Sequence, residues 1–218
     1  MGLRMDKNVA RPPRAKRDPE ATRRALLEAA RREFATKGLA GARVDEIAAR
    51  AGVNKQLVYH HFGDKAGLYL KVLETLYEEI RAREHALQLT GLAPEAAIRK
   101  LVEASFDHLA DHPDFVALLT DENRHGASHI MGSKKLTDMH SPFVELIGQT
   151  LRNGEAAGLF RRGIDPLQLY ISIAGLSFFY FSNTPTLSAI FDTDLSRATA
   201  VKARRAHVID LVMNALRP

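Results

Sequence analysis

Residues 51–62 read AGVNKQLVYHHF, and this stretch predicts a short helix with two chemically different sides. Val58 and Phe62 are spaced i, i+4 and are predicted to face a core. The opposite side carries side chains that can all donate hydrogen bonds: Lys55, Gln56, Tyr59 and His60. Lys and Gln suit base edges in a DNA major groove, and Tyr and His suit phosphate oxygens or bases. The alternative is a solvated helix face, which usually mixes Glu with Lys, but residues 54–62 contain no acidic residue.

Helices are predicted on both sides of this stretch. Asp18-Pro19-Glu20 predicts the start of a helix that Gly38 ends, because Asp caps a helix and Pro suits its first position. Gly52 supplies the backbone freedom of the turn, and Asn54 can cap the helix that follows. We therefore predict helices over residues 18–38, 43–51, 55–62 and from 64 onward, with Leu68, Val72, Leu76 and Ile80 as the apolar stripe of the last.

The charge of the 218-residue chain is concentrated at its N-terminal end. Residues 1–17 carry six Lys or Arg against one Asp, and residues 18–65 carry nine basic and seven acidic residues. Residues 66–218 carry sixteen basic and eighteen acidic residues. A basic arm beside a small domain is typical of a protein that binds a polyanion, although a solubilising disordered tail is an alternative.

Composition excludes several other classes of protein. The chain has no cysteine, which excludes disulfides, thiolate metal sites and a cysteine nucleophile, and which suits a reducing cytoplasm. The N-terminal charges are not followed by an apolar stretch, so we expect no secretory signal. The longest nearly apolar stretch, at 170–181, is too short to cross a bilayer, and we expect no membrane partner.

Helical periodicity continues to the C-terminus, without an alternating strand pattern. The expected fold class is therefore all-α, with an N-terminal three-helix helix-turn-helix domain and a C-terminal helical bundle. We predict helices over about 94–112, from Pro113, and over about 142–158, 166–183 and 196–216, with a partial loop at 126–141. The expected domains are a disordered basic arm over 1–17, a DNA-binding domain over 18–65, and a C-terminal helical domain over 66–218.

The stretch ARVDEIAARAGVNKQLVYHHFGDKAGLY, residues 42–69, resembles the signature of TetR-type regulators. The resemblance implies an all-α homodimeric transcriptional regulator, usually a repressor, that binds a palindromic DNA operator and a small-molecule effector. It implies that DNA, mostly phosphate, is contacted by Arg43, Lys55, Tyr59, His60 and Lys65, and that Gln56 and Leu57 read base edges and thymine methyl groups. Asn54 keeps the helix cap, and the role of His61 is open. Gly67 stands where an acidic residue is usual, and we expect it to loosen the junction between the domains.

The last two helices are more apolar than the surface of a monomer requires. The helix at 166–183 is apolar nearly all round, which predicts burial on two sides. A two-fold interface with a second copy satisfies this pattern, and the alternative is a central core helix of a monomer. The expected interface residues are Tyr170, Ile173, Leu176, Val208, Leu211 and Val212.

A polar cluster, DENRHGASH at 121–129, lies near the middle of the second domain. Polar groups inside an apolar bundle can orient an effector, and the alternative is a solvated helix end. The expected pocket residues are Phe106, Glu122, Asn123, His125, His129 and Phe178. Glu122, His125 and His129 also have a spacing that can hold a metal, but no further ligand is evident, so we expect no metal or other cofactor. Loosely, 112–126 and 163–183 resemble TetR-type regulators of pyrimidine and nitrogen-heteroaromatic catabolism.

Two other classes of protein remain as alternatives. The sequence has none of the patterns G-x-S-x-G, H-E-x-x-H or G-x-G-x-x-G, so an enzyme is not indicated. A DNA-packaging protein that binds without sequence preference would not need the large apolar C-terminal half. The sequence alone leaves open the effector, the operator and whether the effector releases or promotes DNA binding.

Overall fold

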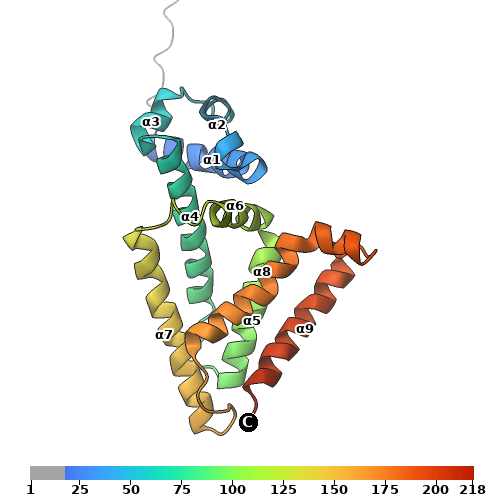
Figure 1. Ribbon diagram of the computed structural model, residues 1–218. Helices are drawn as coiled ribbons and strands as arrows, with labels where there is room; N and C mark the ends of the chain where they lie inside the picture. Colours follow the sequence, from blue (N-terminus) through green and yellow to red (C-terminus); the bar gives the residue numbers. More distant parts are fainter. Residues whose placement is uncertain (1–17) are drawn as a thin grey trace, which may run out of the picture.

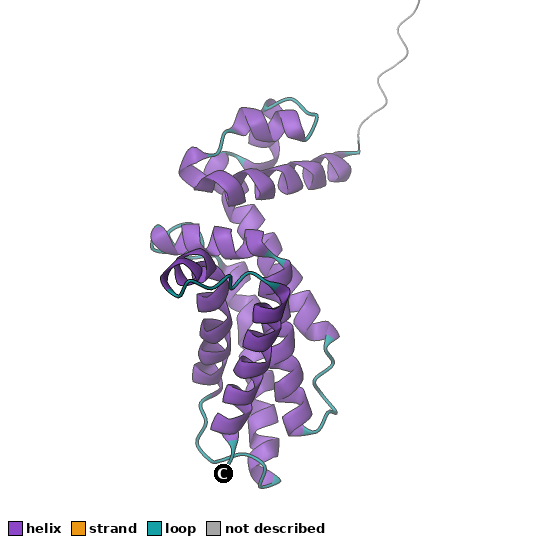
Figure 2. Cartoon of the chain, turned by 90° about the vertical axis from the view of Figure 1, so that its right-hand side faces the viewer, coloured by secondary structure: helices purple, strands orange, loops and turns teal. Residues whose placement is uncertain are grey.

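The computed structural model describes residues 18–218, and every regular element in that range is an α-helix. The expected all-α class is confirmed, and no strand interrupts the helices of this range in Figure 2. The elements are α1 (Pro19–Gly41), α2 (Val44–Arg50), α3 (Gln56–Phe62), α4 (Lys65–Ala86), α5 (Pro94–Asp111), α6 (Pro113–Arg124), α7 (Lys134–Ala156), α8 (Pro166–Ile190) and α9 (Ala198–Leu216). The basic arm over 1–17 lies outside the described residues.

The helices form two groups that α4 connects (Figure 1). The short helices α2 and α3 lie with α1 at one end of the molecule, and α4 runs from them into the second group. There α5, α7, α8 and α9 pack lengthwise, while α6 crosses between the two groups and contacts both α1 and α8. Helix α6 therefore packs against both groups of helices.

Side-chain caps define the starts of three helices. Asp18 accepts a hydrogen bond from the Glu20 amide at 3.0 Å, and Asp64 accepts one from the Gly67 amide at 2.7 Å. Asp165 accepts one from the Gln168 amide at 2.8 Å, directly before Pro166. Each carboxylate satisfies a backbone N–H that has no partner within its own helix, and it also favours the positive end of the helix dipole.

Two apolar cores follow from this arrangement. One core joins α1, α2 and α3 to α4 and α6, and its buried residues include Leu26, Phe34, Ile47, Val58, Val72 and Leu118. It crosses the predicted domain boundary between residues 65 and 66, because the buried stripe of α4 belongs to it. The other core lies among α5, α7, α8 and α9 and contains Phe106, Ile147, Ile173, Val208 and Val212.

The predicted end of the first helix is confirmed, because Gly38, with φ +66°, breaks its helical path and only a short turn to Gly41 follows. Two other predicted helix limits are wrong. Helix α7 begins at Lys134, so Pro142 lies inside it, and α8 continues through Pro185 to Ile190. Proline lacks an N–H donor, so each of these helices lacks one backbone hydrogen bond at its internal proline. In α7, buried Leu136 and Phe143 lie on both sides of Pro142, and their packing outweighs the missing hydrogen bond.

Gly67 has a different role from the one expected. A Cβ atom at this position would lie 2.3 Å from the carbonyl oxygen of Phe62, the last residue of α3. Because no side chain tolerates that distance from backbone, glycine lets α3 and α4 approach closely, and the junction is tightly packed where we expected it to be loose.

None of the helices between residues 18 and 218 combines the length and apolar character needed to cross a membrane.

Candidate nucleic-acid interface and ligand cavity

The outer side of α3 carries the donor side chains that the sequence predicts. Val58 is fully buried and anchors the helix, while Lys55, Gln56, Tyr59 and His60 are exposed on the opposite side. Tyr59 is 46% exposed, which is unusual for a large aromatic residue. The helix thus presents a row of donors on a fixed core, the arrangement a recognition helix needs in a major groove.

The other residues predicted in and next to α3 are exposed Asn54 and half-buried Leu57 and His61. Asn54 Oδ1 accepts a hydrogen bond from the Gln56 amide at 2.9 Å, so its side chain fixes the start of the helix. Leu57 is half-buried and packs against the core, which leaves only part of its side chain for a base contact. His61 is also half-buried, with its ring 5.2 Å from that of His60 and 6.0 Å from that of Phe62.

Two cations near α3 are held in place by neighbouring groups. Lys55 Nζ lies 3.1 Å from Asp45 Oδ1 of α2, and the hydrogen bond to this carboxylate raises the pKa of Lys55. Lys65 Nζ donates to the carbonyl oxygens of Ala42 at 3.2 Å and Ala40 at 3.4 Å, at the end of α1. These contacts orient both side chains without burying Lys55, which remains available to a phosphate.

Arg43 begins α2 above a buried carboxylate. Its side chain is exposed, and its amide donates to Glu33 Oε1 at 3.4 Å. Glu33 is 1% exposed and also accepts a hydrogen bond from Lys37 at 2.7 Å, while Arg50 lies 3.6 Å away. The hydrogen bond from Lys37, with the Arg43 amide and the two cations, lowers the pKa of Glu33 despite its burial. The ionised carboxylate therefore holds the α1–α2 corner that presents Arg43.

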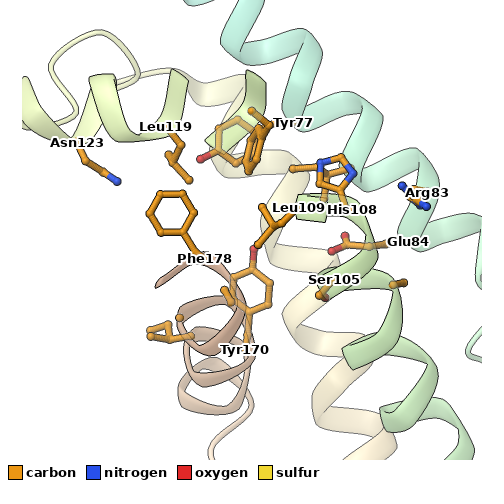
Figure 3. Close-up of a pocket in the computed structure, with 16 residues that line it drawn as sticks. Tyr77, Arg83, Glu84, Ser105, His108, Leu109, Leu119, Asn123, Tyr170 and Phe178 are labelled. Carbon is orange, nitrogen blue, oxygen red and sulfur yellow. The ribbon is translucent and has the colours of Figure 1, made fainter. Parts of the chain in front are cut away.

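A cavity of 330 Å³ lies between α4, α5, α6 and α8 (Figure 3). Most of its lining is apolar, and four aromatic side chains, Tyr77, Phe115, Tyr170 and Phe178, contribute to it. Its polar lining residues are Arg83, Glu84, Ser105, His108 and Asn123. The size and the mostly apolar lining with a few polar groups are typical of a site for a small molecule.

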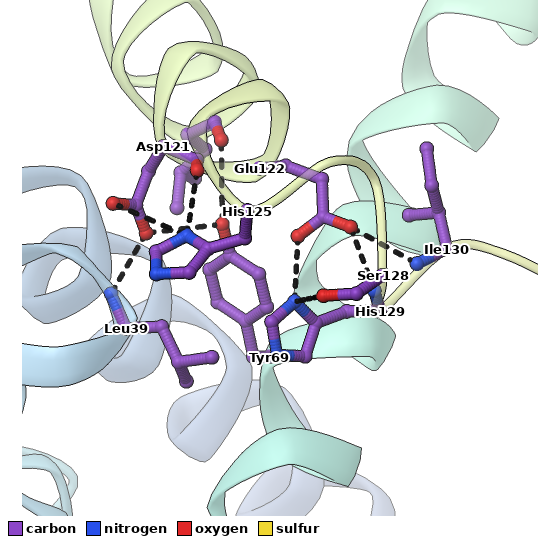
Figure 4. A network of polar contacts seen from close by, with 9 residues as sticks. Leu39, Tyr69, Asp121, Glu122, His125, Ser128, His129 and Ile130 are labelled. Carbon is purple, nitrogen blue, oxygen red and sulfur yellow. Dashed lines mark hydrogen bonds and ion pairs between the residues drawn. The ribbon is translucent and has the colours of Figure 1, made fainter.

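Only two of the six predicted pocket residues line this cavity, namely Asn123 and Phe178. Phe106 is fully buried in the bundle core, where its ring lies 5.0 Å from that of Phe181. Glu122, His125 and His129 lie on the other side of α6, toward α1 and α4 (Figure 4). The polar cluster at 121–129 includes residues on two faces of α6, and only the face that carries Asn123 lies toward the cavity.

Side chains on the other face of α6 form hydrogen bonds and an ion pair with α1 and α4. Asp121 Oδ2 accepts hydrogen bonds from the Leu39 amide at 2.8 Å and from the Tyr69 hydroxyl at 3.3 Å. Glu122 is fully buried and accepts three hydrogen bonds, from the amides of His129 and Ile130 and from His129 Nδ1, at 2.8 to 3.1 Å. At the start of α6, Asp114 pairs with Arg31 of α1.

The histidine and acidic side chains of this network form hydrogen bonds with one another and with backbone groups. His125 Nδ1 donates to the Asp121 carbonyl oxygen at 2.8 Å, while His129 is committed to Glu122. In the part of the chain that the structure describes, no group of three His, Cys, Asp or Glu side chains could hold a metal ion.

Comparisons with known proteins identify the family. The family described as "Bacterial regulatory proteins, tetR family" matches residues 26–72, and "Tetracyclin repressor-like, C-terminal domain" matches residues 94–212. The second match covers more than half of the chain, and the first contains α2, α3 and their turn. This chain belongs to the TetR family. It is therefore a DNA-binding transcriptional regulator and not an enzyme.

Several TetR-family relatives resemble the chain over nearly its full length. The HTH-type transcriptional repressor NicS of Pseudomonas putida is 34% identical over 91% of this chain and 93% of its own. The HTH-type transcriptional regulator RutR of Escherichia coli is 27% identical over 91% of this chain and 92% of its own. The structure of the ketosteroid transcriptional regulator KstR2 of Mycobacterium tuberculosis is similar with a TM-score of 0.64 at 23% identity, covering 90% and 95% of the two chains. This last similarity concerns the fold.

The residues predicted for a TetR-type dimer interface divide into two groups. Ile173, Val208 and Val212 are buried in the chain's own core, where they pack against other residues of the same chain. They were chosen from apolar helices whose inner and outer faces look alike in the sequence. Tyr170 and Leu176 are half-buried, and Leu211 is 44% exposed. The outer face of α8 instead exposes Leu167, Ile171 and Phe179, which are 48, 52 and 58% exposed.

Sequence reasoning missed most of the cavity of this TetR-family chain. The missed residues come from four helices, so no single stretch of sequence contains them. One signal was present in α5, where Leu101, Ser105 and His108 are spaced i, i+4, i+7 on the apolar stripe. A serine and a histidine on the buried face of an amphipathic helix indicate a polar site inside the bundle.

Proposed function

We propose that this TetR-family regulator represses transcription by binding a palindromic operator as a homodimer, and that a small molecule in the cavity changes its affinity for DNA. The observation that carries the proposal is the exposed row of donors on α3, opposite the fully buried Val58. Among the relatives, NicS is named a transcriptional repressor, which supports repression. A regulator of bacterial operators acts in the cytoplasm, and we propose that location.

The side chains divide into base readers and phosphate contacts. Gln56 and Leu57, in the first turn of α3, are proposed to read base edges and thymine methyl groups. Lys55, Tyr59, His60, Arg43 and Lys65 are proposed to contact phosphates, which fixes the register of the helix on DNA. Asn54 and His61 act through the helix itself, since one caps it and the ring of the other contacts those of His60 and Phe62 within it.

The proposed dimer uses the outer face of α8 with Leu211 of α9. Leu167, Ile171 and Phe179 recur every four or eight residues, so they form one apolar stripe along α8. Leu211 borders a groove between α8 and α9 that also includes Gln168 and Ser172. Two copies related by a two-fold axis would cover this surface and present two copies of α3, about 34 Å apart, to successive half-sites.

The proposed coupling runs through α4 and α6, since both helices line the cavity and both contact α1. On α6, Asn123 lines the cavity, while Asp121 Oδ2 accepts a hydrogen bond from the Leu39 amide of α1 at 2.8 Å. A ligand that favours one position of α6 therefore favours one orientation of α1 and of α2, which packs on α1 and contacts α3. The effect on DNA affinity equals the difference between the ligand's affinities for the two orientations.

Selection of bound duplexes from a random DNA pool tests this proposal. We expect the purified chain to recover an inverted repeat with half-sites about one helical turn apart. Gln56→Ala should change the recovered half-site, whereas Lys65→Ala should weaken binding to all sequences and lower the salt slope by about one unit. Recovery of no motif, or equal losses on every sequence for both variants, would contradict the proposal.

A further inference from the structure

The polar groups of the cavity gather mainly at the end formed by α4 and α5. In Figure 3, Glu84, Ser105 and His108 lie together there, while Asn123 approaches from α6 on the other side. The wall between these ends is built from aromatic rings and aliphatic side chains. A ligand that fills this space meets an apolar middle and one concentrated polar end, which we call the α4–α5 polar end (Glu84, Ser105 and His108).

His108 is the central residue of this polar end. It is 6% exposed, and neither of its ring nitrogens has a hydrogen-bond partner among the described residues. The ring is nevertheless firmly placed, because it stacks on His112 with centroids 4.3 Å apart and meets the edge of Phe115 at 5.5 Å. A buried polar group without a partner is costly, so a ligand that bonds it gains affinity.

The ring of His108 is neutral at physiological pH. Burial, together with electrostatic interactions with His112, Arg83 and Arg31, lowers the pKa of His108 to about 4. A neutral imidazole has one nitrogen that donates and one that accepts. His108 can therefore offer a ligand either a donor or an acceptor, but it offers no charge.

The two charged residues of the lining are already paired. Glu84 is 7% exposed and accepts a hydrogen bond from Arg81 Nη2 at 3.0 Å, with Nη1 2.8 Å from its other oxygen. Burial raises the pKa of Glu84 to about 7, although Arg81 offsets part of this rise. Arg83 Nη2 donates a hydrogen bond to Asp111 Oδ2 at 3.2 Å. A charged ligand would lose its hydration without gaining an unpaired opposite charge, which is unfavourable.

We infer that the cavity binds a small, uncharged ring compound that presents a neutral hydrogen-bonding group, such as an amide, to a ring nitrogen of His108 at the α4–α5 polar end. The ring would pack among Tyr77, Phe115, Tyr170 and Phe178, and the volume of 330 Å³ restricts the ligand to a small compound. This inference rests on the proposed function, because it names the chemical class of the effector that the cavity would receive.

A set of one-ring probes of similar size tests the inference on the full chain. Benzamide has the neutral donor and acceptor, benzoate is an anion, benzamidine is a cation, and toluene has no polar group. By titration calorimetry, we expect benzamide to bind at least about tenfold more tightly than each of the other three. Tighter binding of benzoate or benzamidine, or equal binding of toluene, would overturn the inference.

The residue assignment is tested with a matched pair of variants. His108→Phe keeps a ring of similar shape without nitrogens, and it should reduce benzamide affinity to that of toluene. His207→Phe makes the same change at an exposed residue of α9, outside the cavity lining, and it should preserve the preference for benzamide. Loss of the preference in both variants, or in neither, would overturn the role of His108.

DNA binding separates this inference from the proposed function. Each variant is assayed on the selected duplex without ligand, so a variant that binds DNA is folded. A chain that binds its operator but shows no preference among the four probes contradicts only the ligand class. A chain that prefers benzamide but selects no DNA motif contradicts the proposed regulator and leaves the ligand class supported.

Discussion

At the scale of single residues, Gly67 shows how a neighbour can reverse a propensity. Glycine in a helix usually costs about 1 kcal/mol relative to alanine, so Gly→Ala is normally stabilising. Here the new Cβ would lie 2.3 Å from the Phe62 carbonyl oxygen. We therefore expect Gly67→Ala to lower the free energy of unfolding, as measured by urea denaturation, and to weaken DNA binding because it displaces α3.

Gly148 of α7 provides the control for this substitution. A Cβ atom at Gly148 would have as its nearest neighbour the Nη1 atom of Arg152, at 3.3 Å, and this flexible side-chain tip can move aside. Gly148→Ala should leave the free energy of unfolding unchanged or raise it by up to about 1 kcal/mol. If the two substitutions changed the free energy of unfolding equally, the close approach to the Phe62 carbonyl oxygen would not be the cause of the effect at Gly67.

At the scale of elements, α6 has one side toward the cavity and one toward α1. Asp121→Ala removes the acceptor of the Leu39 amide and of the Tyr69 hydroxyl. We expect it to lower the free energy of unfolding by about 1–3 kcal/mol, because a buried donor loses its partner. Urea denaturation measures the loss, and hydrogen exchange should show weaker protection of the Leu39 amide.

Asn123, two residues further along α6, is the matched position on the other side. Asn123→Ala should change ligand binding while leaving the free energy of unfolding within about 0.5 kcal/mol of the parent chain, since this exposed residue only borders the cavity. A large stability loss for Asn123→Ala, or none for Asp121→Ala, would contradict the assignment of the two faces.

At the scale of the whole molecule, the outer face of α8 is expected to hold two copies together. Phe179 is 58% exposed in the single chain, so Phe179→Glu should not disturb its own core. We expect this substitution to convert a dimer into a monomer, as measured by sedimentation equilibrium, because it places a charge in an apolar interface.

Met131 offers a control outside α8. It is 74% exposed in the segment between α6 and α7, and Met131→Glu makes the same kind of change away from the proposed interface. This variant should remain dimeric. A parent chain that sediments as a monomer at every concentration, or a Phe179→Glu variant that stays dimeric, would contradict the interface.

Local patterns in the sequence were enough to specify the helices and the surface of α3. Apolar spacing predicted the buried positions Val58, Leu68 and Val72, and the caps Asp18 and Asp64 marked helix starts, because these features act within one or two turns. The all-α class and the family follow from the same local patterns. The predicted limits of α7 and α8 were wrong because both helices continue through an internal proline, where packing can outweigh one lost hydrogen bond.

The cavity, the buried face of each apolar helix and the link from α6 to α1 emerge from the packing of whole helices. Glu84, His108 and Tyr170 are far apart in the sequence and meet because three helices pack together. Likewise, Ile173 and Ile171 are equally apolar, yet one is buried and the other is 52% exposed. The physical reason is that a local pattern reports which side chains avoid water, whereas the choice of neighbour depends on how whole helices pack.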